Sequence, residues 1–196
     1  MALERTAQRR ERIKQVLSRR QKGLELILAN IHDPHNVSAI YRSCDAFGVA
    51  KVHLYYSTHV FPELKKKSSS SAHKWVESVR HGQAAEMIGG LRARGLRIIA
   101  TGFGPSARPL VDYDLTKPSA IILGNEHAGI DEELLGLVPD QLYIPMQGMV
   151  QSLNVSVASS VILYEAWRQR QAAGMYDQPD YTPVEMEAIT RRWLEK

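Results

Sequence analysis

Three segments of the chain combine amide, carboxylate, hydroxyl and guanidinium side chains within a few residues of one another. They span residues 30–42, 123–130 and 144–156, and their chemistry-bearing side chains are Asn36, Arg42, Glu126, Ser152 and Asn154. Such groups can orient one another through hydrogen bonds and stabilise charge that develops on a reacting oxygen. Each has a simpler interpretation when it stands alone, for example as a helix cap, a surface charge or a loop tie. The segments therefore form a candidate site only if the fold brings them together.

Apolar runs next to these segments predict the elements that would position them. Runs rich in Ile, Leu and Val predict strands at residues 24–31, 51–56, 96–100, 120–123 and 142–145. Helical patterns lie between them at residues 38–47, 84–94 and 131–138. This alternation predicts an α/β domain with a mostly parallel sheet and helices on both faces. Ligands bind such sheets beyond the carboxyl ends of the strands, so we expect a site in the loops after Ile31, Ala100, Leu123 and Ile144.

Helical segments are also predicted at both ends of the chain. Residues 4–22 carry eight basic side chains against two acidic ones, which favours contact with a polyanion over a solvated arm packed on its own domain. A long helix is predicted at residues 151–173 with Gly174 as its stop, and a capping box at Thr182 starts a last helix that reaches Leu194. The predicted boundaries are 1–22 for a basic N-terminal extension, 23–174 for the main domain and 175–196 for a C-terminal extension.

The composition is that of one globular domain in a reducing compartment. The chain has 196 residues, of which 44% are hydrophobic, and one cysteine, Cys44, which has no partner for an internal disulfide. We find no apolar stretch long enough for a signal peptide or a membrane span and therefore expect a cytoplasmic protein. The net charge of +4 and the pI near 9.2 are common in proteins that meet phosphate backbones. Residues 65–71, three lysines followed by four serines, predict a surface loop that either contacts phosphate or has no such role.

Other motifs are poor matches to their chemistry. Residues 102–107 fit the glycine pattern of dinucleotide sites, but Pro105 and Pro109 make a helix start there unconvincing, and that site needs one. There is no phosphate-binding loop of the Walker type and no nucleophile elbow of a serine hydrolase. His32 and His35 lack a third ligand at sensible spacing, so we expect no metal.

Taken together and in this order, the three polar segments resemble the three sequence motifs of the SPOUT class of methyltransferases, in its SpoU-like branch of ribose 2'-O-methylating enzymes. The third segment is the most specific, with Ser-Leu-Asn-Val-Ser at 152–156 after Gly-Met-Val-Gln at 148–151. The chain is most similar to the TrmH group of that branch, which acts on guanosine in tRNA. That resemblance includes the basic N-terminal segment, His73-Lys74-Trp75-Val76 and the arginines that end the long helix, and it covers nearly the whole chain.

The resemblance implies a C-terminal deep trefoil knot, a homodimer and the methyl donor S-adenosyl-L-methionine. A knot could not be deduced from the composition, and knots are so rare that physics alone would argue against one. The family binds its donor in the knot loops. Carried over by position, the donor-binding residues are Thr101, Leu123, Gly124, Ile144, Met146, Gly148, Ser152 and Leu153.

The family assigns the central catalytic role to the arginine of the first motif, which is Arg42 here. A guanidinium is a poor base because its pKa lies above about 12. Arg42 would therefore either remove the hydroxyl proton with help from an RNA phosphate, or stabilise the developing alkoxide as a fixed cation. Asn36, Ser152 and Asn154 are expected to orient Arg42 and the ribose, and Glu126 to hold the arginine loop or the partner subunit.

The resemblance further implies methylation of the ribose 2'-hydroxyl of guanosine 18 in the D-loop of tRNA. Candidate phosphate contacts are Arg9, Arg10, Arg12, Arg19, Arg20, His35, Arg168 and Arg170. The alternatives are 2'-O-methylation of another tRNA position or of ribosomal RNA, and a catalytically silent RNA-binding protein on the same scaffold. The hypothesis of a nicotinamide-dependent oxidoreductase rests only on the weak glycine pattern at residues 102–107.

Overall fold

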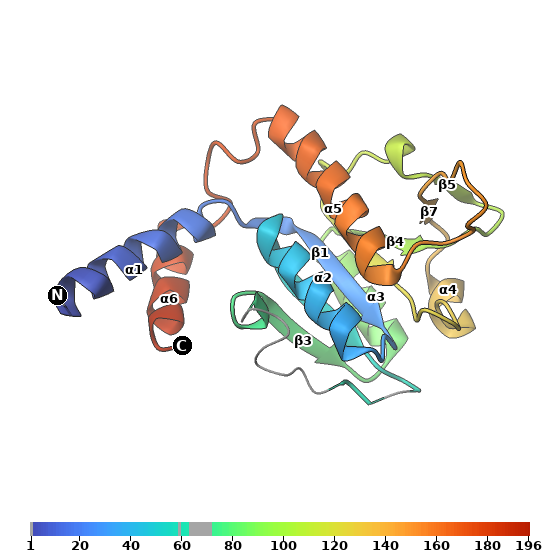
Figure 1. The fold of residues 1–196 in the computed structure, drawn as a ribbon, viewed down its shortest axis with the longest axis horizontal. Helices are drawn as coiled ribbons and strands as arrows, with labels where there is room; N and C mark the ends of the chain where they lie inside the picture. Colours follow the sequence, from blue (N-terminus) through green and yellow to red (C-terminus); the bar gives the residue numbers. More distant parts are fainter. Residues whose placement is uncertain (1, 59, 63–71) are drawn as a thin grey trace.

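The computed structural model describes residues 2–58, 60–62 and 72–196 and contains one seven-stranded sheet (Figure 1). The strands are β1 (Gln21–Ala29), β2 (Val49–Tyr55), β3 (Glu77–His81), β4 (Arg97–Thr101), β5 (Ala107–Pro109), β6 (Ser119–Leu123) and β7 (Gln141–Tyr143). Their order is β3-β2-β1-β6-β4-β7-β5, and every neighbouring pair is parallel. The predicted parallel α/β fold is confirmed.

Six α-helices and two short 3-10 helices accompany the sheet in the described residues. They are α1 (Ala2–Leu17), α2 (Pro34–Ala46), η1 (Ala72–Lys74), α3 (Ala84–Ala93), η2 (Leu110–Asp112), α4 (Glu132–Leu137), α5 (Val155–Ala172) and α6 (Pro183–Leu194). The helices predicted at 38–47, 84–94, 131–138 and 151–173 correspond to α2, α3, α4 and α5. The capping box at Thr182 is present, since the Glu185 amide donates to the Thr182 hydroxyl over 3.3 Å and the Thr182 amide donates to the Glu185 carboxylate over 2.8 Å.

Helices cover both faces of the sheet because successive strand side chains point to opposite sides. Leu24, Leu26 and Leu28 of β1 pack in one buried cluster with residues of α2 and α5. Ile27 and Ala29 of the same strand pack in a second cluster with residues of α3 and α4. A strand buried on both faces carries mostly apolar residues, as β1 does from Leu24 to Ala29 apart from the buried Glu25, which is why β1 could be predicted.

Helices α1 and α6 pack against each other beside the sheet rather than over it (Figure 1). Ile13 and Leu17 of α1 and Trp193 of α6 form a third, smaller buried cluster. The side chain of Lys22, just after the start of β1, donates to Glu185 at the start of α6 over 2.8 Å and so helps to tie this pair to the main domain.

Two predictions of secondary structure are wrong. The helix expected at residues 4–22 ends at Leu17, because Gln21 already pairs with Val49 in the sheet. Strands β3 and β5 were not expected, because they form the two edges of the sheet and carry mostly exposed or half-buried side chains without an apolar pattern. The predicted absence of a helix start at residues 102–107 is confirmed, since strand β5 begins at Ala107.

The predicted basic loop at residues 65–71 lies outside the described residues. Within the described part of the chain, no helix is long and apolar enough to span a membrane.

Candidate active site

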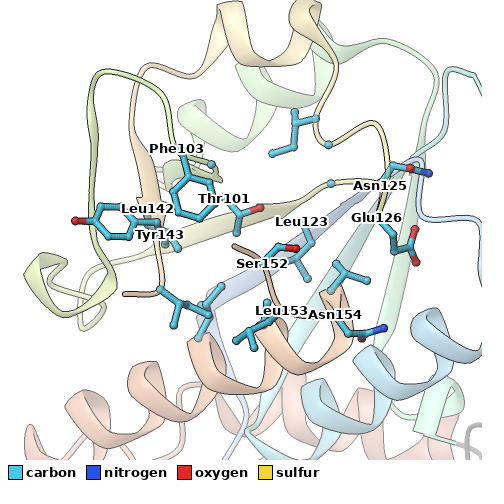
Figure 2. Close-up of a pocket in the computed structure, with 18 of the residues that line it drawn as sticks. Thr101, Phe103, Leu123, Asn125, Glu126, Leu142, Tyr143, Ser152, Leu153 and Asn154 are labelled. Carbon is cyan, nitrogen blue, oxygen red and sulfur yellow. The ribbon is translucent and has the colours of Figure 1, made fainter. Parts of the chain in front are cut away.

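A cavity of about 430 Å³ opens where the loops after β4, β6 and β7 meet the start of α5 (Figure 2). This is the carboxyl end of the parallel strands, where the sequence places the site. Seven of the eight predicted donor-binding residues line it, namely Thr101, Leu123, Gly124, Ile144, Met146, Ser152 and Leu153. The cavity volume and its largely apolar walls suit a ligand of nucleoside size.

Gly124 and Gly148, both predicted donor-binding residues, differ in their surroundings. A side-chain carbon added at Gly124 would lie 2.6 Å from the carbonyl carbon of Gly129 and 2.7 Å from a carbon of Ile130, so the loop must fold on itself there. Gly148, the eighth predicted residue, is exposed and does not line the cavity. A carbon added at Gly148 meets no atom of the described residues within 4 Å.

Aromatic rings stand at one end of the cavity and polar side chains at the other (Figure 2). The rings of Phe103 and Tyr143 lie 5.7 Å apart, and Phe103 is 68% exposed. At the other end, the amide oxygen of the buried Asn125 accepts from the His127 and Ala128 amides at 2.9 and 3.0 Å, which shapes the loop after β6. Phe103, Tyr143 and Asn125 are absent from the predicted site residues. No sequence signal distinguishes Phe103 and Tyr143 from ordinary core and loop residues, whereas Asn125 lies within the predicted segment 123–130.

Three of the five predicted catalytic residues form a continuous hydrogen-bonded chain. Asn36, in the first turn of α2, donates to a Glu126 oxygen over 2.6 Å. Asn154 caps α5, accepts the Ser156 amide over 2.8 Å and donates to the Asn36 amide oxygen over 3.0 Å. These hydrogen bonds join α2, the loop after β6 and the start of α5, so the fold does bring the three polar segments together.

One carboxylate oxygen of Glu126 takes no part in these hydrogen bonds. This second oxygen is buried and has no hydrogen-bond partner in the described part of the chain. His32 is the adjacent cation candidate, with its Nδ1 3.7 Å from that oxygen. A buried acceptor without a donor is costly, so Glu126 is suited to receive a donor from a substrate or from another protein group.

Arg42 and Ser152 lie outside this hydrogen-bonded chain. Arg42 is exposed on α2, does not line the cavity and has no partner among the described residues. Ser152 lines the cavity, but it makes no hydrogen bond to Asn36, Glu126 or Asn154, so the expected clustering with them is not found.

Six of the eight predicted phosphate-contacting residues are exposed: Arg9, Arg10, Arg12, Arg19, His35 and Arg168. Two of these arginines already carry acidic partners. Arg10 pairs with Glu187 of α6 at 2.5 Å, and Arg168 with Glu165 of its own helix at 2.8 Å. Exposed pairs of this kind are weak and can exchange for a phosphate.

The remaining two, Arg20 and Arg170, are buried, and the prediction of phosphate contact is wrong for both. Arg20 is 2% exposed, donates to the Val49 carbonyl over 2.8 Å and forms an ion pair with Asp45. These contacts tie the turn after α1 to the end of α2.

Arg170 is completely buried and donates only to neutral acceptors. These are the carbonyls of Leu115, Gly23 and Lys117 and the side-chain oxygen of Gln21, at 2.8 to 3.2 Å. Burial lowers the pKa of Arg170. The guanidinium therefore links the end of α5 to β1 and to the loop before β6 through these hydrogen bonds.

Residues 23–164 match the family model described as the SpoU rRNA Methylase family. The chain is 46% identical, over 193 residues, to a tRNA (guanosine(18)-2'-O)-methyltransferase of Thermus thermophilus, covering 98% of this chain and 99% of the relative. It is similar to a solved TrmH/SpoU tRNA modifying enzyme of A. aeolicus, with a TM-score of 0.91, 35% identity and coverage of 97% and 96%. The SpoU methyltransferase AviRb of Streptomyces viridochromogenes, solved with the cofactor AdoMet, has a TM-score of 0.69 and 27% identity, with 78% of this chain and 62% of that one covered.

Proposed function

Because this chain belongs to the SpoU rRNA methylase family, we propose that it transfers a methyl group from S-adenosylmethionine to the ribose 2'-hydroxyl of guanosine 18 in tRNA. The observation that carries the proposal is the near full-length similarity to the Thermus thermophilus enzyme of that specificity, which includes the terminal segments as well as the core. The tRNA substrate makes the cytoplasm the expected site of action.

The residues around the cavity fit the methyl donor. Leu142, Ile144 and Leu153 provide apolar surface for an adenine ring, and the half-buried Gly124 also lines the cavity. The Thr101 hydroxyl is already used, since it donates to the Ile122 carbonyl over 3.0 Å, so main-chain groups would carry most of the polar recognition. When bound there, the donor supplies an electrophilic methyl group for an in-line attack by the ribose oxygen.

Asn36, Glu126 and Asn154 act as positioning residues in this proposal. Asn36 is committed on both sides, because its amide nitrogen donates to Glu126 and its amide oxygen accepts from Asn154. The set fixes α2 relative to the donor cavity and leaves one buried Glu126 oxygen to accept a hydrogen bond from the substrate.

Arg42 supplies the positive charge at the reacting oxygen. It is the arginine of the first motif, it is exposed and it has no acidic partner among the described residues, so its five donors are available to an alkoxide or a phosphate. It acts either as a fixed cation or as a base assisted by a phosphate of the RNA.

We also assign to the protein a homodimer and the deep trefoil knot of its family. The exposed side of α5 carries Val157, Val161 and Tyr164, which are 48%, 37% and 53% exposed and form an apolar face that a second copy would cover. The knot rests on the similarity to the TrmH/SpoU enzyme of A. aeolicus, which covers 97% of this chain. Sedimentation of the purified protein tests the dimer.

The test of the function is to incubate the purified protein with unmodified tRNA and methyl-labelled S-adenosylmethionine and to map the labelled nucleotide. Label on the 2'-oxygen of guanosine 18 is the expected result. Label at another tRNA position, or only in ribosomal RNA, would keep the chemistry and replace the substrate. Donor binding without label in any RNA would favour the catalytically silent RNA-binding protein.

A further inference from the structure

A second cavity, of about 330 Å³, lies between α6, η1 and the edge strand β3. None of its lining residues belongs to the donor cavity. Figure 1 shows α6 on the side of the molecule away from β4 and β7, so the two cavities are separate sites. The volume of the second cavity lies in the range of pockets that hold small ligands.

Aromatic rings form one wall of this second cavity. Trp75 follows η1, Trp193 lies in the last turn of α6, and their rings lie 5.2 Å apart. Trp193 is 6% exposed and anchors the wall from the small core of α1 and α6. Trp75 and Tyr181 are only half-buried, and the Lys22 ammonium lies 5.2 Å from the Tyr181 ring centre, so the exposed parts of the two rings are the surface that a planar ligand could contact.

Cations surround these rings. The Lys196 ammonium lies 6.0 Å from the Trp75 ring centre and 5.9 Å from that of Trp193. Arg192 also lines the cavity, is exposed and has no ion-pair partner in the described part of the chain. The pKa of Lys196 is lowered, first by burial and then by the charges of Arg192 and Lys74, as expected where positive charge is not balanced.

One buried nitrogen atom beside the cavity has no hydrogen-bond partner in the described part of the chain. Arg20 lines the cavity at 2% exposure, with its guanidinium carbon 5.8 Å from the Trp193 ring centre, and its Nε has no hydrogen-bond partner. One side-chain carboxylate lines the cavity among the described residues, that of Glu77, and it is paired with Lys51 at 3.3 Å. The cavity therefore combines ring surface with an excess of positive charge and an unused buried donor.

We propose that this second cavity binds one unpaired nucleotide of the tRNA substrate, with its base stacked on Trp75 and Tyr181 and its phosphate at Arg192 and Lys196. Planarity and negative charge together are the properties of a nucleotide, and aromatic rings flanked by cations are how proteins hold single-stranded nucleic acid. The identity of the RNA as tRNA rests on the proposed function. The cavity would secure the substrate at a distance from the methyl-transfer site.

The experiment measures the affinity of unmodified tRNA for the full chain and for variants, over a series of salt concentrations. Trp75→Leu removes the ring and should weaken binding about 5- to 150-fold, the stacking contribution of one base, without changing the salt slope. Trp75→Phe keeps a ring and should retain most of the affinity. Arg192→Gln should lower the salt slope by about 0.7 to 0.9. Arg191→Gln is its matched control, because Arg191 is exposed on the same turn of α6 but does not line the cavity.

Unchanged tRNA affinity in Trp75→Leu, or equal salt slopes in the Arg191 and Arg192 variants, would overturn the proposal. If Trp75→Leu does not fold, as judged by circular dichroism, the comparison of Arg192→Gln with Arg191→Gln decides whether the cavity binds tRNA. Quenching of Trp75 fluorescence by AMP, with tRNA affinity insensitive to every cavity variant, would identify a free nucleotide and overturn the assignment to tRNA. Tight tRNA binding that depends on Trp75, but without methyl transfer, would refute the proposed function and leave this site standing.

Discussion

Arg168 and Arg170 lie two residues apart near the end of α5, yet their replacement should change different properties of the protein. Arg168 is exposed and paired with Glu165, whereas Arg170 is completely buried and hydrogen-bonded to four neutral acceptors. Methionine in place of either residue preserves much of the side-chain length and removes the charge. Arg168→Met should weaken tRNA binding, and Arg170→Met should weaken the fold.

The expected loss of stability in Arg170→Met follows from the four acceptors that lose their hydrogen-bond donor. A buried acceptor left without a donor costs about 1 to 3 kcal/mol, so four of them cost about 4 kcal/mol at the low end of that range. Water entry and relief from burying the guanidinium offset part of this cost, which leaves an expected loss of about 3 kcal/mol in the free energy of unfolding. The exposed pair of Arg168 contributes less than about 1 kcal/mol.

Urea unfolding of both variants and of the unchanged protein measures the stability, and the midpoint shift at constant slope gives the difference. Filter binding of tRNA at several salt concentrations measures the affinity and its salt dependence. Arg168→Met should lower the salt slope by about 0.7 to 0.9, and Arg170→Met should leave it unchanged. If Arg170→Met unfolded at the same urea concentration as the unchanged protein and also lost salt slope, the assignment of Arg170 to the interior would be refuted.

Substitutions at four further positions test the site and the terminal helices. Arg42→Ala and Arg42→Lys should each lower kcat by about 100-fold or more with both ligands still bound, and normal turnover in single-turnover assays would exclude either role of the guanidinium. Asn36→Ala should lower kcat about 10- to 100-fold with little effect on donor affinity measured by calorimetry; a change in donor affinity alone would place Asn36 in donor binding instead. Gly124→Ala should cost about 1 to 3 kcal/mol and weaken donor binding, because its new carbon meets backbone, and thermal unfolding with donor titration would detect both. The pKa of Glu185 is lowered to about 2, first by the hydrogen bond from Lys22, so its stabilising effect is complete above its ordinary pKa of 4.5 and is lost as the pH falls toward 2. Urea midpoints across that pH window should fall less steeply in Glu185→Gln, and parallel curves would disprove the link.

The positions of the catalytic candidates were predictable, but their contacts were not. Asn36, Glu126 and Asn154 are recognisable from their motifs, and the parallel-sheet rule places all three near strand ends. That Asn36 would donate to Glu126 and accept from Asn154 depends on residues 90 and 118 positions away, and no local pattern encodes such distances. The motif likewise gives no indication that Arg42 lies outside the lining of the donor cavity.

The amino-acid sequence by itself determined the parallel α/β class, the main helices, the capping box at Thr182 and the loops that carry the site. These features arise from local periodicity and from the rule that continuous apolar runs form strands buried on both faces. Only the tertiary structure decided which basic residues face solvent: Arg168 and Arg170 are both arginines in one helix, but just one of them meets the carbonyls of β1 and of the loop before β6. The edge strands were decided in the same way, because a strand with exposed polar side chains owes its conformation to hydrogen bonds with its neighbour rather than to its own residues.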